Sequence, residues 1–311
     1  MHNIKRFLWI YLCVLTGLWL ATDLTPWSTP ADFFAWRSVL MQYGGVLAIG
    51  VMSAAMVLAV RPVVFEPYLG GLDKMYRLHK WLGISALVIS ISHWLLAQGP
   101  KWMVGWGWLE RPVRGPRSVL VDAPVQQFFA SQRGLAEGIG EWAFYAAVAL
   151  MVLALVKRFP YRLFFKTHHL IAIAYLALVV HSVVLLRFED WTGLLGPVMA
   201  VLMAAGTASA FMVLFGRVAT ARKVSGEVVA VRHNATLDVT QVDVRCAGRW
   251  TGHTPGQFAF VTLHAGEGPH PYTMAPWHRP GVATAPSRSS SRHWVTTPVP
   301  SRTAYRLAIP C

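Results

Sequence analysis

The sequence predicts a membrane protein whose fold is an all-α six-helix bundle, followed by a partial antiparallel β-barrel and a disordered tail. Six long apolar stretches, few charged residues and a change of character after Gly216 lead to this prediction. Charged residues make up 14% of the 311-residue chain, against about 25% in soluble proteins. We expect the bundle at residues 1–216, the partial barrel at 217–275 and the tail at 276–311.

Each apolar stretch is close to the ~20 residues that a helix needs to cross a bilayer. Because unpaired backbone polar groups are too costly in lipid, we expect all of them to be helices in contact with a lipid bilayer. The stretches are Ile4–Thr22, Val39–Val60, Tyr76–Ala97, Trp142–Val156, His168–Leu186 and Trp191–Phe215.

Basic residues in the loops predict the orientation of the helices. The formal net charge of +14 would suggest nucleic-acid binding in a soluble chain, but most bases here flank apolar stretches, so we expect no nucleic-acid partner. Short basic segments before the first stretch and after the second, fourth and sixth all fall on one side, which is the cytoplasmic side by the positive-inside rule. The loop from Gln98 to Gly138 carries five bases on the other side and counts against the rule. We predict an inner-membrane protein with six spans and both termini in the cytoplasm.

After Gly216 the sequence changes to short β-branched runs between Gly, Asn and Pro residues, which is typical of strands. These runs are Val228–Val231, Leu237–Val244 and Gln257–Leu263. We predict the start of a small antiparallel β domain on the cytoplasmic side.

Four histidines lie inside the apolar stretches, where ligating residues are costly and are therefore functional candidates. His79 and His93 are 14 residues apart, which in a helix gives a rise of roughly 21 Å and an offset of about 40°. His168 and His181 are 13 residues apart, with a similar rise of about 20 Å but an offset of about 140°. His169 would give about 120°, so helical geometry alone does not choose between His168 and His169.

Two histidine pairs with matching rises on different helices predict two haems, one above the other across the bilayer. We pair His79 with His168 at the cytoplasmic side and His93 with His181 at the outer side, each pair holding one haem iron. A haem with both axial positions filled transfers electrons rather than binding oxygen at the metal. The alternative is that each histidine only forms hydrogen bonds within the bundle, which does not explain the matching pairs.

Basic residues near the two ends of these helices are candidates to balance haem propionates. The candidates at the inner end are Arg77, Lys80, Arg162 and Lys166, and those at the outer end are Arg37 and Arg187. For the inner four, a role in setting membrane topology explains the pattern equally well, and both interpretations stay open.

The histidine motifs resemble those of the ferric reductase/NADPH oxidase superfamily. The resemblance rests on Arg-Leu-His-Lys at residues 77–80, on His93, and on Lys-Thr-His-His-Leu at residues 166–170 with His181. It covers roughly residues 1–275 and implies a six-helix domain with two b-type haems. In the family's Thr-His-His motif the first histidine is the usual ligand, which favours His168 over His169.

Two further motifs resemble the FAD-binding barrel of ferredoxin-reductase-type proteins. Pro-Gly-Gln-Phe at residues 255–258 is similar to a strand motif of that barrel, although such a motif alone needs nothing more than a turn. His270-Pro271-Tyr272-Thr273 resembles the family's flavin motif. The resemblance implies that Tyr272 lies against the flavin, that Thr273 hydrogen-bonds near its reactive nitrogen, and that His270 helps to hold the phosphate or ribose.

Residues 276–311 depart from the family pattern, which continues with the rest of the barrel and an NADPH-binding domain. They contain five Arg, six Pro and five Ser but no Asp, Glu or Lys, a composition typical of disorder. Codons for Pro286–Pro300 can be chosen so that a shifted frame reads Val-Ala-Phe-Val-Ile-Lys-Ala-Leu-Gly-Asp-Tyr-Thr-Arg-Ala, which resembles the family's next barrel strand. We therefore expect an out-of-frame, unstructured tail in a chain without the NADPH-binding domain.

The resemblance implies an oxidoreductase that passes electrons from NADPH through FAD and two b-type haems to an external acceptor such as a ferric chelate or dioxygen. For this chain we expect haem binding, weak or lost FAD binding and little turnover with NADPH. One alternative is a haem-bearing membrane subunit that a separate soluble flavoprotein reductase supplies with electrons. Another is a non-functional truncated product.

Overall fold

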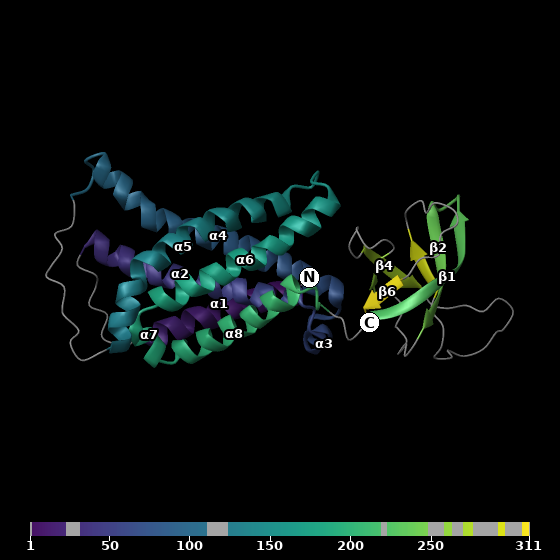
Figure 1. Ribbon diagram of the computed structural model, residues 1–311, viewed down its shortest axis with the longest axis horizontal. Helices are drawn as coiled ribbons and strands as arrows, with labels where there is room; N and C mark the ends of the chain where they lie inside the picture. Colours follow the sequence, from purple (N-terminus) through teal and green to yellow (C-terminus); the bar gives the residue numbers. More distant parts are fainter. Residues whose placement is uncertain are drawn as a thin grey trace. The chain divides into compact units, whose positions relative to one another are not determined.

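The computed structural model describes residues 2–22, 32–110, 124–218, 223–247, 258–262, 270–275, 292–295 and 307–310. The chain forms two compact units, one made of Met1–Phe65 with Lys74–Gly216 and the other of Glu66–Asp73 with Arg217–Cys311. Long helices make up the first unit, and the second contains a β-sheet (Figure 1).

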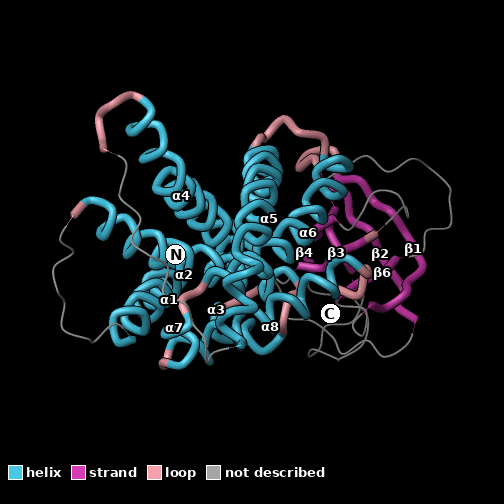
Figure 2. Tube along the Cα trace, turned by 60° about the vertical axis from the view of Figure 1, so that its left-hand side comes forward, coloured by secondary structure: helices cyan, strands magenta, loops and turns pink. Residues whose placement is uncertain are grey.

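Six helices among the described residues are long and apolar enough to cross a membrane, which confirms the predicted all-α membrane bundle. They lie alongside one another in both views (Figures 1 and 2). They are α1 (His2–Thr22), α2 (Phe33–Ala59), α4 (Leu72–Gly105), α5 (Pro124–Leu155), α6 (Tyr161–Leu185) and α8 (Leu195–Leu214). Shorter segments lie between them in the sequence, namely η1 (Val63–Phe65), α3 (Glu66–Leu69) and α7 (Phe188–Thr192).

The helices α4 and α5 are longer than the sequence predicts, with 34 and 32 residues. Both extend into the stretch from Gln98 to Gly138 that we expected to be a loop. At ~1.5 Å per residue α4 is about 51 Å long, well beyond the ~30 Å hydrocarbon core of a bilayer. Helix beyond that core need not be apolar, so hydropathy does not mark where these two helices end.

Backbone spacing in the bundle is uneven. The helix α5 lies close against α6, and α2 lies close against α8. Within the described residues, α4 makes no comparably close backbone approach to another helix. Side chains therefore fill a wider gap around α4 than around the other helices, and the candidate site lies on that side.

A buried polar contact joins α2, α6 and α8. Tyr175 of α6 is fully buried, and its hydroxyl lies 2.9 Å from the Ser53 hydroxyl of α2. Gly206 of α8 faces the same ring, and a Cβ at this position would overlap the Tyr175 hydroxyl. Because polar groups inside a bilayer must find partners in the protein, this contact fixes how the three helices meet.

The second unit contains a six-stranded antiparallel sheet in the order β3-β4-β5-β2-β1-β6. The strands are β1 (Lys223–Asn234), β2 (Val239–Ala247), β3 (Phe258–Val261), β4 (His270–Ala275), β5 (Arg292–Val295) and β6 (Leu307–Pro310). The first three confirm the predicted strands. Buried Val244, Val261 and Met274 belong to the core of this sheet. The edge strands β3 and β6 approach each other but do not pair within the described residues, so the sheet is not a closed barrel.

The prediction of a wholly unstructured tail is wrong in part. The strand β5 pairs with β2 and β4, and β6 pairs with β1, although both belong to residues 276–311. Each strand contains a short run that favours β-structure, Trp-Val at residues 294–295 and Leu-Ala-Ile at residues 307–309. The composition of the whole segment, rich in Pro and Ser, obscured these two runs.

Candidate functional site

The helix α4 presents His79 to α6 at one end of the bundle. The ring centroids of His79 and His168 are 6.0 Å apart, with an angle of 69° between the ring planes. The Nδ1 atom of His79 lies 2.9 Å from the carbonyl oxygen of Ala55 in α2. Because a carbonyl can only accept, His79 donates through Nδ1, which leaves its Nε2 lone pair for another ligand. We call this end of the bundle the His79 end.

The two adjacent histidines of α6 have different surroundings. The His168 ring stacks on Phe164, with centroids 5.0 Å apart and an interplanar angle of 22°. His169 donates through Nδ1 to the carbonyl of Phe165 in its own helix, at 2.6 Å. The structure therefore brings His168 to His79 and gives His169 a partner within α6, a distinction that helical geometry alone left open.

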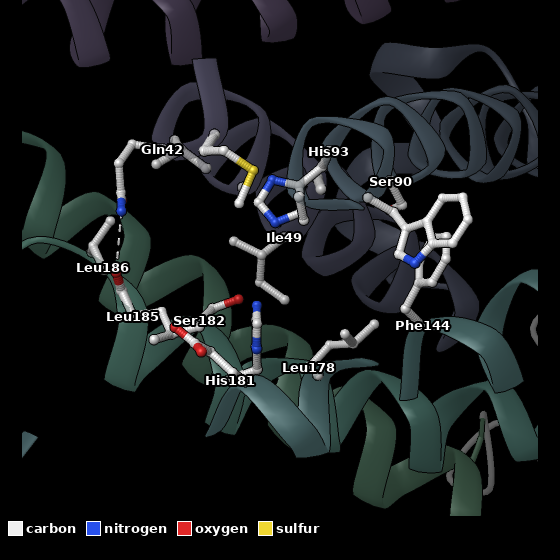
Figure 3. Close-up of a pocket in the computed structure, with 18 of the residues that line it drawn as sticks. Gln42, Ile49, Ser90, His93, Phe144, Leu178, His181, Ser182, Leu185 and Leu186 are labelled. Carbon is white, nitrogen blue, oxygen red and sulfur yellow. Dashed lines mark hydrogen bonds between the residues drawn. The ribbon is translucent and has the colours of Figure 1, made fainter. Parts of the chain in front are cut away.

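At the other end of the bundle, His93 and His181 line one cavity of about 410 Å³. Its walls come from α2, α4, α5, α6 and α8. Figure 3 shows His93 from α4 and His181 from α6 pointing toward each other across this space. We call this the His93 end. The structure thus brings together both histidine pairs that the sequence predicts.

Glycines provide the space beside these two imidazoles. A Cβ on Gly44 would lie 3.5 Å from the His93 ring, and one on Gly45 would lie 3.4 Å from it. A Cβ on Gly140 of α5 would overlap the His181 ring. The His181 ring therefore needs glycine at position 140, whereas a Cβ on Gly44 or Gly45 would make ordinary van der Waals contact with the His93 ring.

The histidines of the His93 end differ in their hydrogen bonding. His181 donates through Nδ1 to the carbonyl oxygen of Ala136 in α5, at 2.8 Å. Nδ1 of His93 is buried, and among the described residues no partner completes a hydrogen bond with it, although the Met41 backbone lies nearby. Nδ1 of His168, at the His79 end, is likewise buried without such a partner.

The protein donors come in pairs rather than in larger clusters. The described residues contain no group of three or more His, Cys, Asp or Glu side chains that could hold a bare metal ion. Zinc sites take three or four protein ligands, whereas a haem iron takes at most two, one on each side of the ring. A histidine bound to metal also commonly donates its second nitrogen to a backbone carbonyl, as His79 and His181 do here.

Of the two outer propionate candidates, only Arg37 lines the cavity. Arg187 instead pairs with buried Asp190 through two contacts of 3.0 and 3.1 Å. The cavity is also lined by Lys101 and Arg133, which our sequence reasoning did not select. Both belong to the stretch from Gln98 to Gly138, whose five bases do not fit the positive-inside rule. That excess of bases was the available sequence signal that some of them line a site.

The inner propionate candidates are at the surface where the structure describes them. Arg77 and Lys80 of α4 and Lys166 of α6 are exposed, and nothing is described of the Arg162 side chain. Exposure fits both a propionate partner and a base that sets topology. Their role stays a prediction.

The flavin motif forms the first part of β4. His270 pairs with Val261, and Thr273 pairs with Phe258, in the neighbouring strand β3. Tyr272 packs on the core of the sheet, whereas Thr273 is exposed. Residues 255–257 of the other flavin-barrel motif lie outside the described residues.

The family model for the ferric reductase like transmembrane component matches residues 44–179. The helical unit of this chain is similar to that family over the matched range. The matched range contains His79, His93 and His168, and His181 lies two residues beyond it. A search of curated proteins gives no match to the chain. The match and the six membrane-length helices support a ferric-reductase-like membrane protein, and that family suggests an oxidoreductase in general terms.

Proposed function

We propose that this chain is a transmembrane electron-transfer protein that holds two b-type haems between α4 and α6. His79 and His168 bind one haem iron, and His93 and His181 bind the other. The observation that carries this proposal is the meeting of two histidine pairs from the same two helices at opposite ends of the bundle.

The geometry of the His79 end supports two axial ligands on one metal. With a metal–nitrogen bond of about 2 Å, as for imidazole on other first-row metals, two rings on opposite sides of an iron have centroids about 6 Å apart. The centroid distance between His79 and His168 is 6.0 Å. The bond from His79 to the Ala55 carbonyl would hold the ring with Nε2 toward the metal.

The His93 end supports the proposal through the space between its two imidazoles. Its volume of about 410 Å³ falls within the ~300–1,000 Å³ of typical ligand sites. Gly45 and Gly140 leave room at the two imidazoles.

The pair His79 and His168 and the pair His93 and His181 would each hold one haem, which would supply one-electron transfer. The chain orients the imidazoles through the Ala55 and Ala136 carbonyls, which also raise the electron-donating power of the rings. Buried Leu78 and Leu82 of α4 exclude water beside His79. The protein thus sets the spacing of the haems, their ligands and the exclusion of water along the electron-transfer path.

We place the His79 end at the cytoplasmic side, where FAD bound at the His270–Thr273 motif would supply electrons that originate from NADPH. The His93 end then faces outward and delivers electrons to an external acceptor such as a ferric chelate or dioxygen. The basic segments beside α4 and α6 support this orientation. A separate flavoprotein is the second candidate for the direct donor, because the sequence leads us to expect weak or lost FAD binding at this motif.

Haem quantitation and absorption spectra of the purified membrane protein test the proposal. The unaltered chain should carry two low-spin haems, and each of His79→Ala, His93→Ala, His168→Ala and His181→Ala should lose one of them. If all four variants keep two haems, the ligand assignment is wrong. If the unaltered chain binds no haem when it is produced with haem supplied, the function itself is wrong.

The source of electrons is tested by mixing the haem-loaded protein with NADPH and FAD, with and without a soluble flavoprotein reductase. Reduction of the haem bands by NADPH and FAD alone supports a donor within this chain. Reduction only when the flavoprotein is added assigns the chain to a membrane subunit with a separate donor.

A further inference from the structure

Pro100 interrupts the outer part of α4. It lies buried inside this helix, 28 residues after the helix begins at Leu72. A proline has no N–H, so the carbonyl four residues earlier, that of Leu96, loses its partner in the helix. A buried carbonyl without a partner is costly, and something else has to donate to it.

The donor comes from another helix. Arg37 of α2 donates through Nε to the Leu96 carbonyl oxygen at 2.7 Å, and through Nη2 to the Ala97 carbonyl oxygen at 3.4 Å. The planar guanidinium can meet two neighbouring acceptors at once, which a lysine ammonium does less well. Arg37 therefore replaces the N–H that Pro100 removes from the ladder of α4.

This contact lies beside His93. Leu96 follows His93 by three residues, less than one turn of α4, and Arg37 lines the same cavity as His93. Gly44 and Gly45, which lie against the His93 ring, follow Arg37 by seven and eight residues and so share its face of α2. One face of α2 thus contacts both the His93 ring and the turn of α4 that Pro100 interrupts.

We propose that Arg37 is a positioning residue that holds the proline-interrupted turn of α4 and thereby aims His93 into the cavity. Its charge-bearing group is engaged by backbone carbonyls of α4, so its main role is this one rather than pairing with a haem propionate. The effect of Arg37 on haem content rests on the proposed function. Its effect on amide exchange in α4 does not.

The deciding experiment combines Arg37→Met with Pro100→Ala in the full-length protein. Pro100→Ala restores the N–H that satisfies the Leu96 carbonyl, so the double variant no longer needs the arginine. We expect Arg37→Met to lose the haem of the His93 end, from two haems per chain toward one. Amide exchange over residues 97–105 should rise about tenfold as the turn opens locally. The double variant should recover both the haem and the slow exchange.

Two further variants separate hydrogen bonding from charge. Arg37→Gln keeps a donor for the Leu96 carbonyl without charge, and Arg37→Lys keeps the charge without the two-pronged geometry. We expect Arg37→Gln to retain more of the second haem than Arg37→Met. If only Arg37→Lys retains it and Pro100→Ala does not rescue Arg37→Met, the arginine acts through its charge and the proposal is overturned.

Amide exchange keeps the test independent of haem binding. If the unaltered protein carries no haem, the proposed function fails, but exchange over residues 97–105 still reports on Arg37. Exchange in this segment that is equal in the unaltered protein and in Arg37→Met would overturn the positioning role, whatever the haem content.

Discussion

The two ends of the helical bundle each carry one histidine from α4 and one from α6, but the surroundings of the two pairs differ. At the His79 end, the His168 ring stacks on Phe164 and the facing imidazoles are 6.0 Å apart. At the His93 end, the imidazoles border a cavity of about 410 Å³ and lie against glycines. The His79 end therefore depends on contacts between aromatic rings. The His93 end depends on glycines that have no side chain.

This difference indicates how each end should respond to substitution. A site built on glycine backbone tolerates little added volume, because close-packed surroundings give way only at a cost. A site defined by a stacked imidazole depends instead on which histidine faces the gap. The His93 end should therefore be sensitive to small additions, and the His79 end to exchanges between neighbouring residues of α6.

The sharpest test of the His79 end is the comparison of His168→Ala with His169→Ala. The first should lose one haem outright, because it removes the imidazole that faces His79. The second should keep both haems, because His169 is bonded within α6. Pyridine haemochrome assays on both purified variants give the count. Loss of a haem in His169→Ala with two haems in His168→Ala would reverse the assignment.

A single methyl group added at Gly140 should disrupt haem binding at the His93 end. A Cβ there overlaps the His181 ring, so Gly140→Ala should weaken or abolish the second haem and destabilise the protein by about 1–3 kcal/mol. The His79 end should keep its haem. Gly138→Ala is the matched control, because its Cβ would have no heavy atom within 4 Å. Equal haem content in the two variants would contradict the explanation that Gly140 leaves space for the His181 ring.

Between the two ends, the Ser53–Tyr175 contact should matter for stability rather than for either haem alone. Tyr175→Phe and Ser53→Ala should each lower the free energy of unfolding by about 0.5–1.5 kcal/mol. Their effects should be less than additive in the double variant, because they remove the same bond. Unfolding titrations in detergent measure this. Loss of one specific haem, with stability unchanged, would assign the pair to that site instead.

The smallest effect is expected for the exposed ion pair of Arg133 and Glu137 at the His93 end. Their side chains are 60% and 57% exposed at a separation of 3.0 Å. Glu137→Gln should change the free energy of unfolding by less than about 0.5 kcal/mol. Thermal melts at low and high salt provide the measurement. A larger loss, or an altered haem spectrum, would show that this pair supports haem binding in addition to lining the cavity.

Much of the helical unit was predictable, because its signals are local. The span Ile4–Thr22 agrees with the structure at both ends, and the other spans differ mainly where helix continues past the apolar core. The ends of α4 and α5 were missed because polar residues outside the hydrocarbon carry no hydropathy signal. The strands β5 and β6 were missed because their partners lie far away in the sequence.

The candidate site was predictable in its vertical spacing and not in its lateral contacts. Helical rise placed His79 and His93 at two different depths along α4, but the angular offset on α6 left His168 and His169 equivalent. The stacking on Phe164 and the bond from His169 to Phe165 separate them. For Arg37, the sequence suggested a propionate partner, while its contact with the Leu96 carbonyl became visible only once α2 and α4 lay side by side.

The sequence by itself therefore determined that this is a six-span membrane protein with four histidines at two depths, because hydropathy and helical rise depend only on neighbouring residues. The tertiary structure alone decided which histidines face each other, which glycines leave room for them and which arginine supports an interrupted helix. Those features depend on contacts between residues 24 to 89 positions apart, such as His79 with Ala55 and His79 with His168, and no local pattern encodes them.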